Sequence, residues 1–201
     1  GQATLPLLRR HVGLAPGALT VLSADERGRG VAEAAGARFI HCHLKPDNYH
    51  RQLSRYVGAG DLLLNLSVDV SSLDLVEWCA ESGALYVDTS IEPWPGVFDN
   101  PMLSLRERTN YLTRERMLRL GRRLGPQSPT AIVDHGANPG LVSHFVKQAL
   151  LDVAAATGDV GAEPTDRAGW AALAQRLGVK AIHIAERDTQ VSAQPKRPGE
   201  F

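Results

Sequence analysis

The sequence has little cysteine, no excess of charge and no long apolar run. Its two cysteines, Cys42 and Cys79, are too few for a disulfide framework, and we expect buried thiols in a reducing compartment. The 22 basic and 22 acidic residues balance, which argues against a general binder of nucleic acids or membrane surfaces. No run approaches the ~20 apolar residues of a membrane-spanning helix, and no signal-peptide pattern is seen. We therefore expect a cytoplasmic protein with no nucleic-acid or membrane partner.

Metal ligands and catalytic nucleophiles are also scarce. His41 and His43 lie two residues apart on one expected strand, but no third ligand follows at a plausible spacing. We therefore expect no metal site. The chain has no Gly-x-Ser-x-Gly motif and no evident pair of nucleophile and base. Arginines recur through residues 103–124, a pattern that could attract anions but is also typical of a solvated helix face.

What the sequence does contain is an alternation of apolar and helical segments. Its 201 residues, 43% of them apolar, fit one globular domain or one and a half. Apolar runs predict strands at residues 18–24, 38–44, 61–66, 84–88 and 130–134. Helical patterns occupy residues 28–37, 47–57, 71–82, 103–124 and 141–156. Strands so apolar are buried on both faces, so the rhythm predicts an α/β fold: a Rossmann-type, doubly wound parallel sheet.

Both ends of the sequence suggest an internal fragment of a longer protein. The first helical pattern, in which Leu5, Leu8 and Val12 share a face, has no strand before it, which is unusual at the start of a folded α/β domain. Near the other end, a helix at 166–177 and an alternating strand at 179–186 precede polar coil. We expect residues 1–145 to form a truncated dinucleotide-binding domain and 146–201 to begin a second, α+β substrate domain.

The first predicted strand is followed by an acidic residue, Asp25. Ligands of doubly wound sheets bind outside the carboxyl ends of the strands, where such a residue would accept hydrogen bonds from the ribose of NAD. The alternative is an ordinary N-cap for the next helix. Arg27 and Arg29 could instead hold the 2′-phosphate of NADP, but Asp25 would repel it, so NAD is favoured. Gly1 could be the last glycine of the phosphate-binding turn.

Polar residues also follow the third and fourth strands. Asn65, Ser67 and Asp69 lie on one side of an extended segment, although capping of the helix that starts near Ser71 would explain them too. The fourth strand runs into residues 88–94 (Asp-Thr-Ser-Ile-Glu-Pro-Trp). Carboxylates beside an aromatic ring suit an organic cation, whereas the alternative is a solvated loop.

Two further segments carry candidate site residues. In residues 135–140 (His-Gly-Ala-Asn-Pro-Gly), Gly136 and Gly140 allow close approach of the backbone, and Asn138 offers a side-chain amide. The alternative is that Asn138 serves only the geometry of the turn, in which an Asn-Pro pair is common. Glu186 is a carboxylate at the end of the last predicted strand, where an ion pair with Arg187 is the alternative.

Four blocks of the sequence resemble the bacterial homospermidine synthases of the saccharopine dehydrogenase-like group. The blocks are residues 65–69, 86–94, 134–145 and 182–190. Members of that family are about twice as long as this chain, so the resemblance implies that Gly1 is the last glycine of the dinucleotide turn. It further implies that the first strand of the sheet and the rest of the substrate domain are absent. It also implies a homodimer at full length.

The resemblance implies an activity. The family joins two putrescines, or putrescine and spermidine, with release of ammonia or diaminopropane, and its bound NAD is reduced and reoxidised in each cycle. The implied substrate residues are Glu92, Asn138 and Glu186. The implied cofactor residues are Gly1, Asp25, Asn65, Ser67, Val68, Asp69, Thr89, His135, Gly136, Ala137 and Asn138.

Two alternatives remain open. A saccharopine-type or carboxynorspermidine-type dehydrogenase would need a positioned arginine for its substrate carboxylate, whereas the strand ends carry acids. A non-catalytic nucleotide-sensing module would need no acidic pocket. Diamines are dications at neutral pH, and Asp69, Glu92 and Glu186 are the carboxylates that would meet them.

Overall fold

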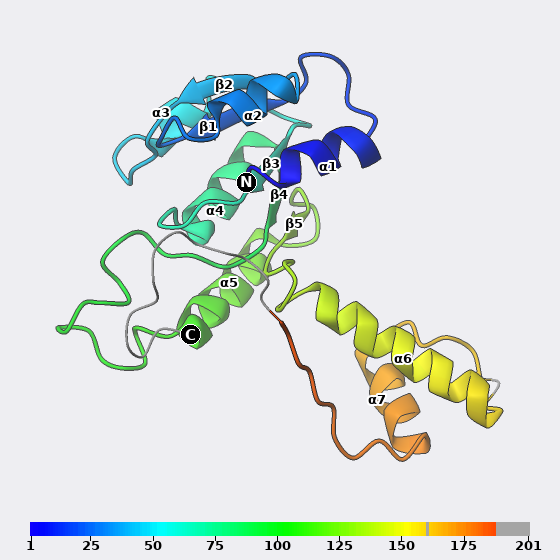
Figure 1. Cartoon of the computed structure of the whole chain (residues 1–201). Coiled ribbons are helices and arrows are strands. Elements are labelled where there is room, and N and C mark those ends of the chain that lie inside the picture. Colours follow the sequence, from blue (N-terminus) through cyan, green and yellow to red (C-terminus); the bar gives the residue numbers. More distant parts are fainter. Residues whose placement is uncertain (160, 188–201) are drawn as a thin grey trace. The chain divides into compact units, whose positions relative to one another are not determined.

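Helices and parallel strands alternate along the computed structural model, which describes residues 1–159 and 161–187 (Figure 1). The chain divides into a first unit, Gly1–Leu141, and a second, which begins at Val142. Within the described residues, every strand belongs to the first unit. None of the helices described is long and apolar enough to cross a membrane.

The strands of the first unit form two parallel sheets. They are β1 (Thr20–Ser23), β2 (Arg38–His41), β3 (Leu62–Asn65), β4 (Leu85–Asp88) and β5 (Ala131–Ile132). One sheet has the order β1-β2 and the other the order β3-β4-β5. In the second sheet Asn65 lies opposite Asp88, so these two strands end side by side.

The break between the two sheets has a simple interpretation. In the doubly wound order 3-2-1-4-5-6, the first strand lies between strands two and four. If β1 and β2 are strands two and three, and β3 is strand four, the break falls at the position of the first strand. Among the described residues, no strand pairs with β1 and β3 there. The predicted Rossmann-type α/β class is confirmed.

Local signals set the helices of the first unit. These helices are α1 (Thr4–His11), α2 (Arg29–Ala34), α3 (Tyr49–Leu53), α4 (Ser72–Ser82) and α5 (Asn110–Leu124). The Ser71 side chain caps α4 by accepting a hydrogen bond from the Asp74 N–H, and Gly83 ends the helix with a φ of 75°. The helix expected to start near Ser71 is therefore confirmed, with Ser71 as its N-cap.

The largest core cluster lies around α4 and β4. Leu75 and Trp78 of α4, Tyr86 of β4 and Met117 of α5 are all buried in it. Leu22 of β1 packs against the same cluster, so the two sheets share one core. This core supports the strand ends that the sequence nominates as a site.

Several elements are shorter than predicted, and the structure differs most from the sequence-based prediction in two places. Residues 179–187 are irregular, so the strand predicted at 179–186 is wrong: alternation alone does not make a strand without a neighbour to pair with, and the described residues offer none. The helix predicted at 103–124 begins only at Asn110. Before it, Ser104 bonds Glu107 and the Thr109 hydroxyl donates to the Arg106 carbonyl, and such local bonds compete with a helix.

The second unit is built on two helices, α6 (Leu141–Thr157) and α7 (Arg167–Arg176), the first of which starts at the last residue of the first unit. Leu150, Ala154 and Leu173 form its buried cluster. The Asp166 side chain caps α7 by accepting from the Gly169 N–H at 2.7 Å.

Candidate functional site

A buried chain of hydrogen bonds joins the carboxyl ends of β3 and β4. The Asn65 amide donates to the Tyr86 hydroxyl at 3.1 Å, and that hydroxyl donates to Asp88 Oδ2 at 2.9 Å. The Asp88 side chain is completely buried, and its burial raises the pKa of the carboxyl above its ordinary value. Asn65 Oδ1 in turn accepts from the Ser67 N–H at 3.1 Å, which sets the start of the following loop.

The turn that follows β5 is attached to the same aspartate. The Asp134 N–H donates to Asp88 Oδ1 at 2.7 Å, and the His135 N–H donates to the Asp88 carbonyl at 3.1 Å. A Cβ on Gly136 would lie 2.7 Å from the carbonyl oxygen of Thr89, so only glycine lets these two segments pass so closely. The turn thereby presents Ala137 and Asn138 as exposed residues.

The backbone of Glu92 is fixed from two sides. Its N–H donates to the Ser72 hydroxyl at 3.0 Å, and its carbonyl accepts from the Ser72 N–H at 2.8 Å. The preceding N–H, of Ile91, donates to Asp134 Oδ1 at 3.0 Å. The half-buried Glu92 carboxylate accepts from the Ser90 hydroxyl at 3.1 Å. This loop is anchored, not solvated along its length as the alternative interpretation required.

Trp94 anchors the far side of that loop. Its indole N–H donates to Asp74 of α4, and its ring lies 5.6 Å from the Tyr49 ring, centroid to centroid. The aromatic residue that the sequence placed beside the carboxylates therefore packs on the core.

The loop after β3 is open to solvent. Ser67, Val68 and Asp69 are all exposed, and Asp69 has a φ of 60°. Because Ser71 caps α4, capping does not account for the polar residues before it. A loop of this kind, at the carboxyl end of a parallel strand, is where such sheets place ligands.

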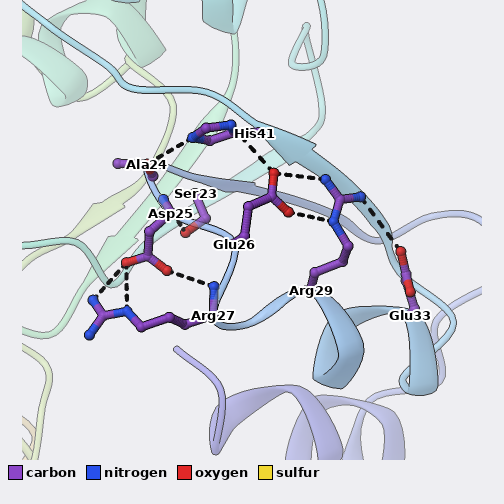
Figure 2. Close-up of polar contacts among 8 residues, drawn as sticks. All are labelled: Ser23, Ala24, Asp25, Glu26, Arg27, Arg29, Glu33 and His41. Atoms are coloured by element: carbon purple, nitrogen blue, oxygen red, sulfur yellow. Dashed lines mark hydrogen bonds and ion pairs between the residues drawn. The ribbon is translucent and has the colours of Figure 1, made fainter.

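Asp25 follows β1 with a half-exposed side chain and is paired with Arg27 (Figure 2). Its carboxylate accepts from the Arg27 side chain at 2.6 Å and from the Arg27 N–H at 2.9 Å. The Arg27 side chain, helped by that N–H, holds the pKa of the Asp25 carboxyl below its ordinary value. Helix α2 has Gly28 as its N-cap, so the alternative role of Asp25 as that cap is not observed.

The neighbouring residues form a second polar group at this edge (Figure 2). One ring nitrogen of His41, at the end of β2, lies 2.9 Å from the Ala24 carbonyl, and the other lies 3.4 Å from Glu26. Glu26 is also paired with Arg29. Arg27 and Arg29 both have carboxylate partners, so neither is a ready-made site for a phosphate group.

The remaining predicted residues are less constrained. Gly1 is exposed and precedes α1. Glu186 is exposed in the irregular segment of the second unit, so its predicted place at a strand end is wrong. Among the residues described, no group of three or more His, Cys, Asp or Glu side chains is arranged to hold a metal ion.

Comparison with known proteins identifies the family. The family model described as the saccharopine dehydrogenase NADP binding domain matches residues 1–132. The chain belongs to this family. Over 98% of its length it is 49% identical to a homospermidine synthase of Blastochloris viridis and 40% identical to one of Mesorhizobium japonicum. It spans only 42% and 41% of those proteins.

A solved structure agrees with these relatives. The chain is similar to the crystal structure of the homospermidine synthase of Legionella pneumophila in complex with NAD, with a TM-score of 0.82 and 39% identity. The match covers 99% of this chain and 40% of that one. The resemblance to homospermidine synthases is confirmed.

Sequence reasoning missed several residues that shape this saccharopine dehydrogenase-type site. Tyr86, Ser72 and Asp134 hold the strand ends together, and Asp88 was noted only as a carboxylate in a loop. The sequence did contain a signal, since Asp88 and Asp134 are each the last residue of a predicted strand. Nothing local, however, indicates that two positions 46 residues apart share a hydrogen bond.

Proposed function

We propose that this chain forms the NAD-binding part of a homospermidine synthase. In this proposal the full-length enzyme, a homodimer, joins two putrescines, or putrescine and spermidine, with release of ammonia or diaminopropane. The relatives named homospermidine synthase support this assignment. The observation that carries it is an anchored carboxylate, Glu92, next to open loops at the carboxyl ends of parallel strands.

The residues present fit a dinucleotide. When bound, NAD would supply a hydride acceptor that later returns the hydride. The half-exposed Asp25 side chain lies where a ribose would bind, and the loop at Ser67–Asp69 and the turn at 135–138 offer polar groups and an accessible backbone. Although the family model is described as NADP-binding, we favour NAD, because the Asp25 carboxylate would repel a 2′-phosphate and already engages Arg27.

Glu92 and Asn138 would bind the amine substrate. Putrescine is a dication near neutral pH, and a carboxylate held in a half-buried place can meet its ammonium group with a charge-assisted hydrogen bond. The same carboxylate could take the proton that must leave the amine before its carbon loses a hydride. We propose that residues from 146 onward begin the substrate domain and that Glu186 contributes from there.

The test uses a full-length protein that contains this chain. It is incubated with putrescine and substoichiometric NAD, and the products are identified by mass spectrometry. Homospermidine in excess of the NAD supplied would support the proposal. Stoichiometric formation of NADH with an amino-acid substrate would favour the dehydrogenase alternative, and NAD binding without any product would favour the sensing module.

A further inference from the structure

Asp88 is a buried acid to which the proposed reaction assigns no role. Its side chain is fully buried, and its two oxygens accept from the Tyr86 hydroxyl and the Asp134 N–H. The Ser72 hydroxyl is a further hydrogen-bonding neighbour, which partly offsets the effect of burial on the Asp88 pKa. All of these donors are neutral. A buried carboxylate without a cationic partner is costly, so a simple space-filling role does not explain an acid here.

Three segments of the proposed site meet at this one residue. Through Tyr86 it is connected to Asn65 and the loop after β3. Through Asp134 and His135 it holds the turn that presents Asn138. Asp134 also accepts from the N–H of Ile91, the residue that precedes Glu92, so the Glu92 loop is held by the same contacts. The loop proposed to bind the cofactor, the turn that carries Asn138 and the loop that carries Glu92 are thus all connected to the Asp88 side chain.

The hydrogen-bond inventory explains why this position needs a carboxylate. An amide side chain has one acceptor oxygen and one donor group. If the oxygen of an asparagine at 88 kept the Asp134 N–H, its NH₂ group would face the Tyr86 oxygen, which already receives the Asn65 amide. The Tyr86 hydroxyl hydrogen would then lose its acceptor on residue 88. Only a carboxylate accepts on both sides.

We propose that Asp88 is a positioning residue, which sets the placement of the Glu92 loop, the Asn138 turn and the Asn65 loop relative to one another. The effect on turnover rests on the proposed function, because Glu92 and Asn138 have their roles only there. The effect on the loops does not, since it follows from the contacts alone.

The first arm of the test measures amide hydrogen exchange in the full-length protein without substrate. Asp88→Asn should speed exchange at Asp134, His135 and Ile91 by about tenfold or more, the scale of one lost charged hydrogen bond. Met117→Ala is the matched control, because it opens a cavity in the same core without touching these bonds. Equal effects of the two variants, or no effect of Asp88→Asn, would overturn the proposal.

A milder variant covers the possibility that Asp88→Asn does not fold. Tyr86→Phe keeps the ring and removes only the hydroxyl that joins Asn65 to Asp88. It should speed exchange at Ser67, whose N–H depends on the placement of Asn65, more than at amides of α5. Unchanged exchange at Ser67 would contradict the proposal.

The second arm measures turnover of putrescine. Misplacement of reacting groups lowers kcat, so Asp88→Asn should reduce kcat by roughly tenfold or more, while the KM for putrescine and the affinity for NAD change much less. Glu92→Gln is assayed alongside. If Glu92→Gln loses turnover and Asp88→Asn does not, the positioning role of Asp88 is contradicted, and the proposed function is not. If Glu92→Gln is fully active, the proposed function of Glu92 fails, and the exchange result still decides the role of Asp88.

Discussion

The two polar edges of the first unit are built in opposite ways. At the ends of β4 and β5, Asp88 is fully buried and accepts a hydrogen bond from Asp134, 46 positions along the chain. At the ends of β1 and β2, the Asp25 side chain is half exposed, and its partner Arg27 is two positions away. One edge is fixed by buried contacts between distant segments. The other is held by pairs at the surface, most of them between near neighbours in the sequence, with His41 as the link to β2.

The difference suggests a division of labour. A buried network orders Glu92 before any ligand arrives, which favours chemistry that depends on orientation. An exposed pair such as Asp25 and Arg27 is screened by solvent and can exchange partners at little cost. Such a pair suits the proposed role of Asp25, in which its carboxylate would turn from Arg27 to a ribose.

The largest effect should come from the fixed edge. Glu92→Gln keeps the shape of the side chain and removes its charge, so turnover of putrescine should fall by ~100-fold or more, the range of a lost acid–base group. NAD affinity should change little. Steady-state kinetics and NAD titration of the full-length protein measure both, with Glu77→Gln on the exposed side of α4 as the control. Normal turnover would contradict the account; joint loss of NAD would make Glu92 structural and pass its role to Glu186 or Asp69.

A smaller effect is expected at the exposed edge. Asp25→Ala removes the carboxylate proposed to bind the ribose, so NAD should bind roughly tenfold more weakly, the scale of one charged hydrogen bond. The ratio of NADP to NAD affinity should rise, because the repulsion of a 2′-phosphate is gone. Calorimetric titration with both dinucleotides measures this, and Glu33→Ala on α2 is the control. Unchanged NAD affinity would remove Asp25 from the site.

The buried edge should also leave a mark on the pH dependence of stability. Burial raises the pKa of Asp88 above its ordinary value of 3.8, so the folded state retains a proton that the unfolded state releases. The stabilisation that comes from this retained proton is fully present below pH 3.8. It is lost as the pH rises through the pKa of Asp88 in the folded state. The wild-type protein should therefore lose stability relative to Asp88→Asn over that range. Urea unfolding at a series of pH values measures the free energies of unfolding of both proteins. If the wild-type protein instead gained stability relative to Asp88→Asn as the pH rises, the pKa of Asp88 would not be raised by burial.

The smallest effect is expected from Arg27→Ala. Its side chain is 85% exposed, and an exposed ion pair contributes little to folding. The thermal unfolding midpoint should be unchanged, in contrast to a clear decrease for Met117→Ala in the core. A decrease for Arg27→Ala as large as that for Met117→Ala would erase the distinction between the two edges.

Local features of the fold were predictable from the sequence, and long-range contacts were not. Helix α4 was predicted close to its observed bounds, because its apolar periodicity and its cap at Ser71 depend only on neighbouring residues. The strand predicted at 179–186 failed because a strand depends on a partner that its own residues do not specify. The sequence correctly placed Glu92 in a loop after a strand. It did not indicate the hydrogen bond between Glu92 and Ser72, because these residues are 20 positions apart. Periodicity and caps carry no information about such pairs.

The most direct test is a structure of the full-length protein with NAD and putrescine bound. The account predicts the Glu92 carboxylate within hydrogen-bonding distance of a putrescine ammonium group, and the Asp25 carboxylate on the hydroxyls of the adenosine ribose. The Asp88 contacts to Tyr86 and Asp134 should be the same as in the absence of ligands. Putrescine bound away from Glu92, or Asp25 turned away from the ribose, would contradict it.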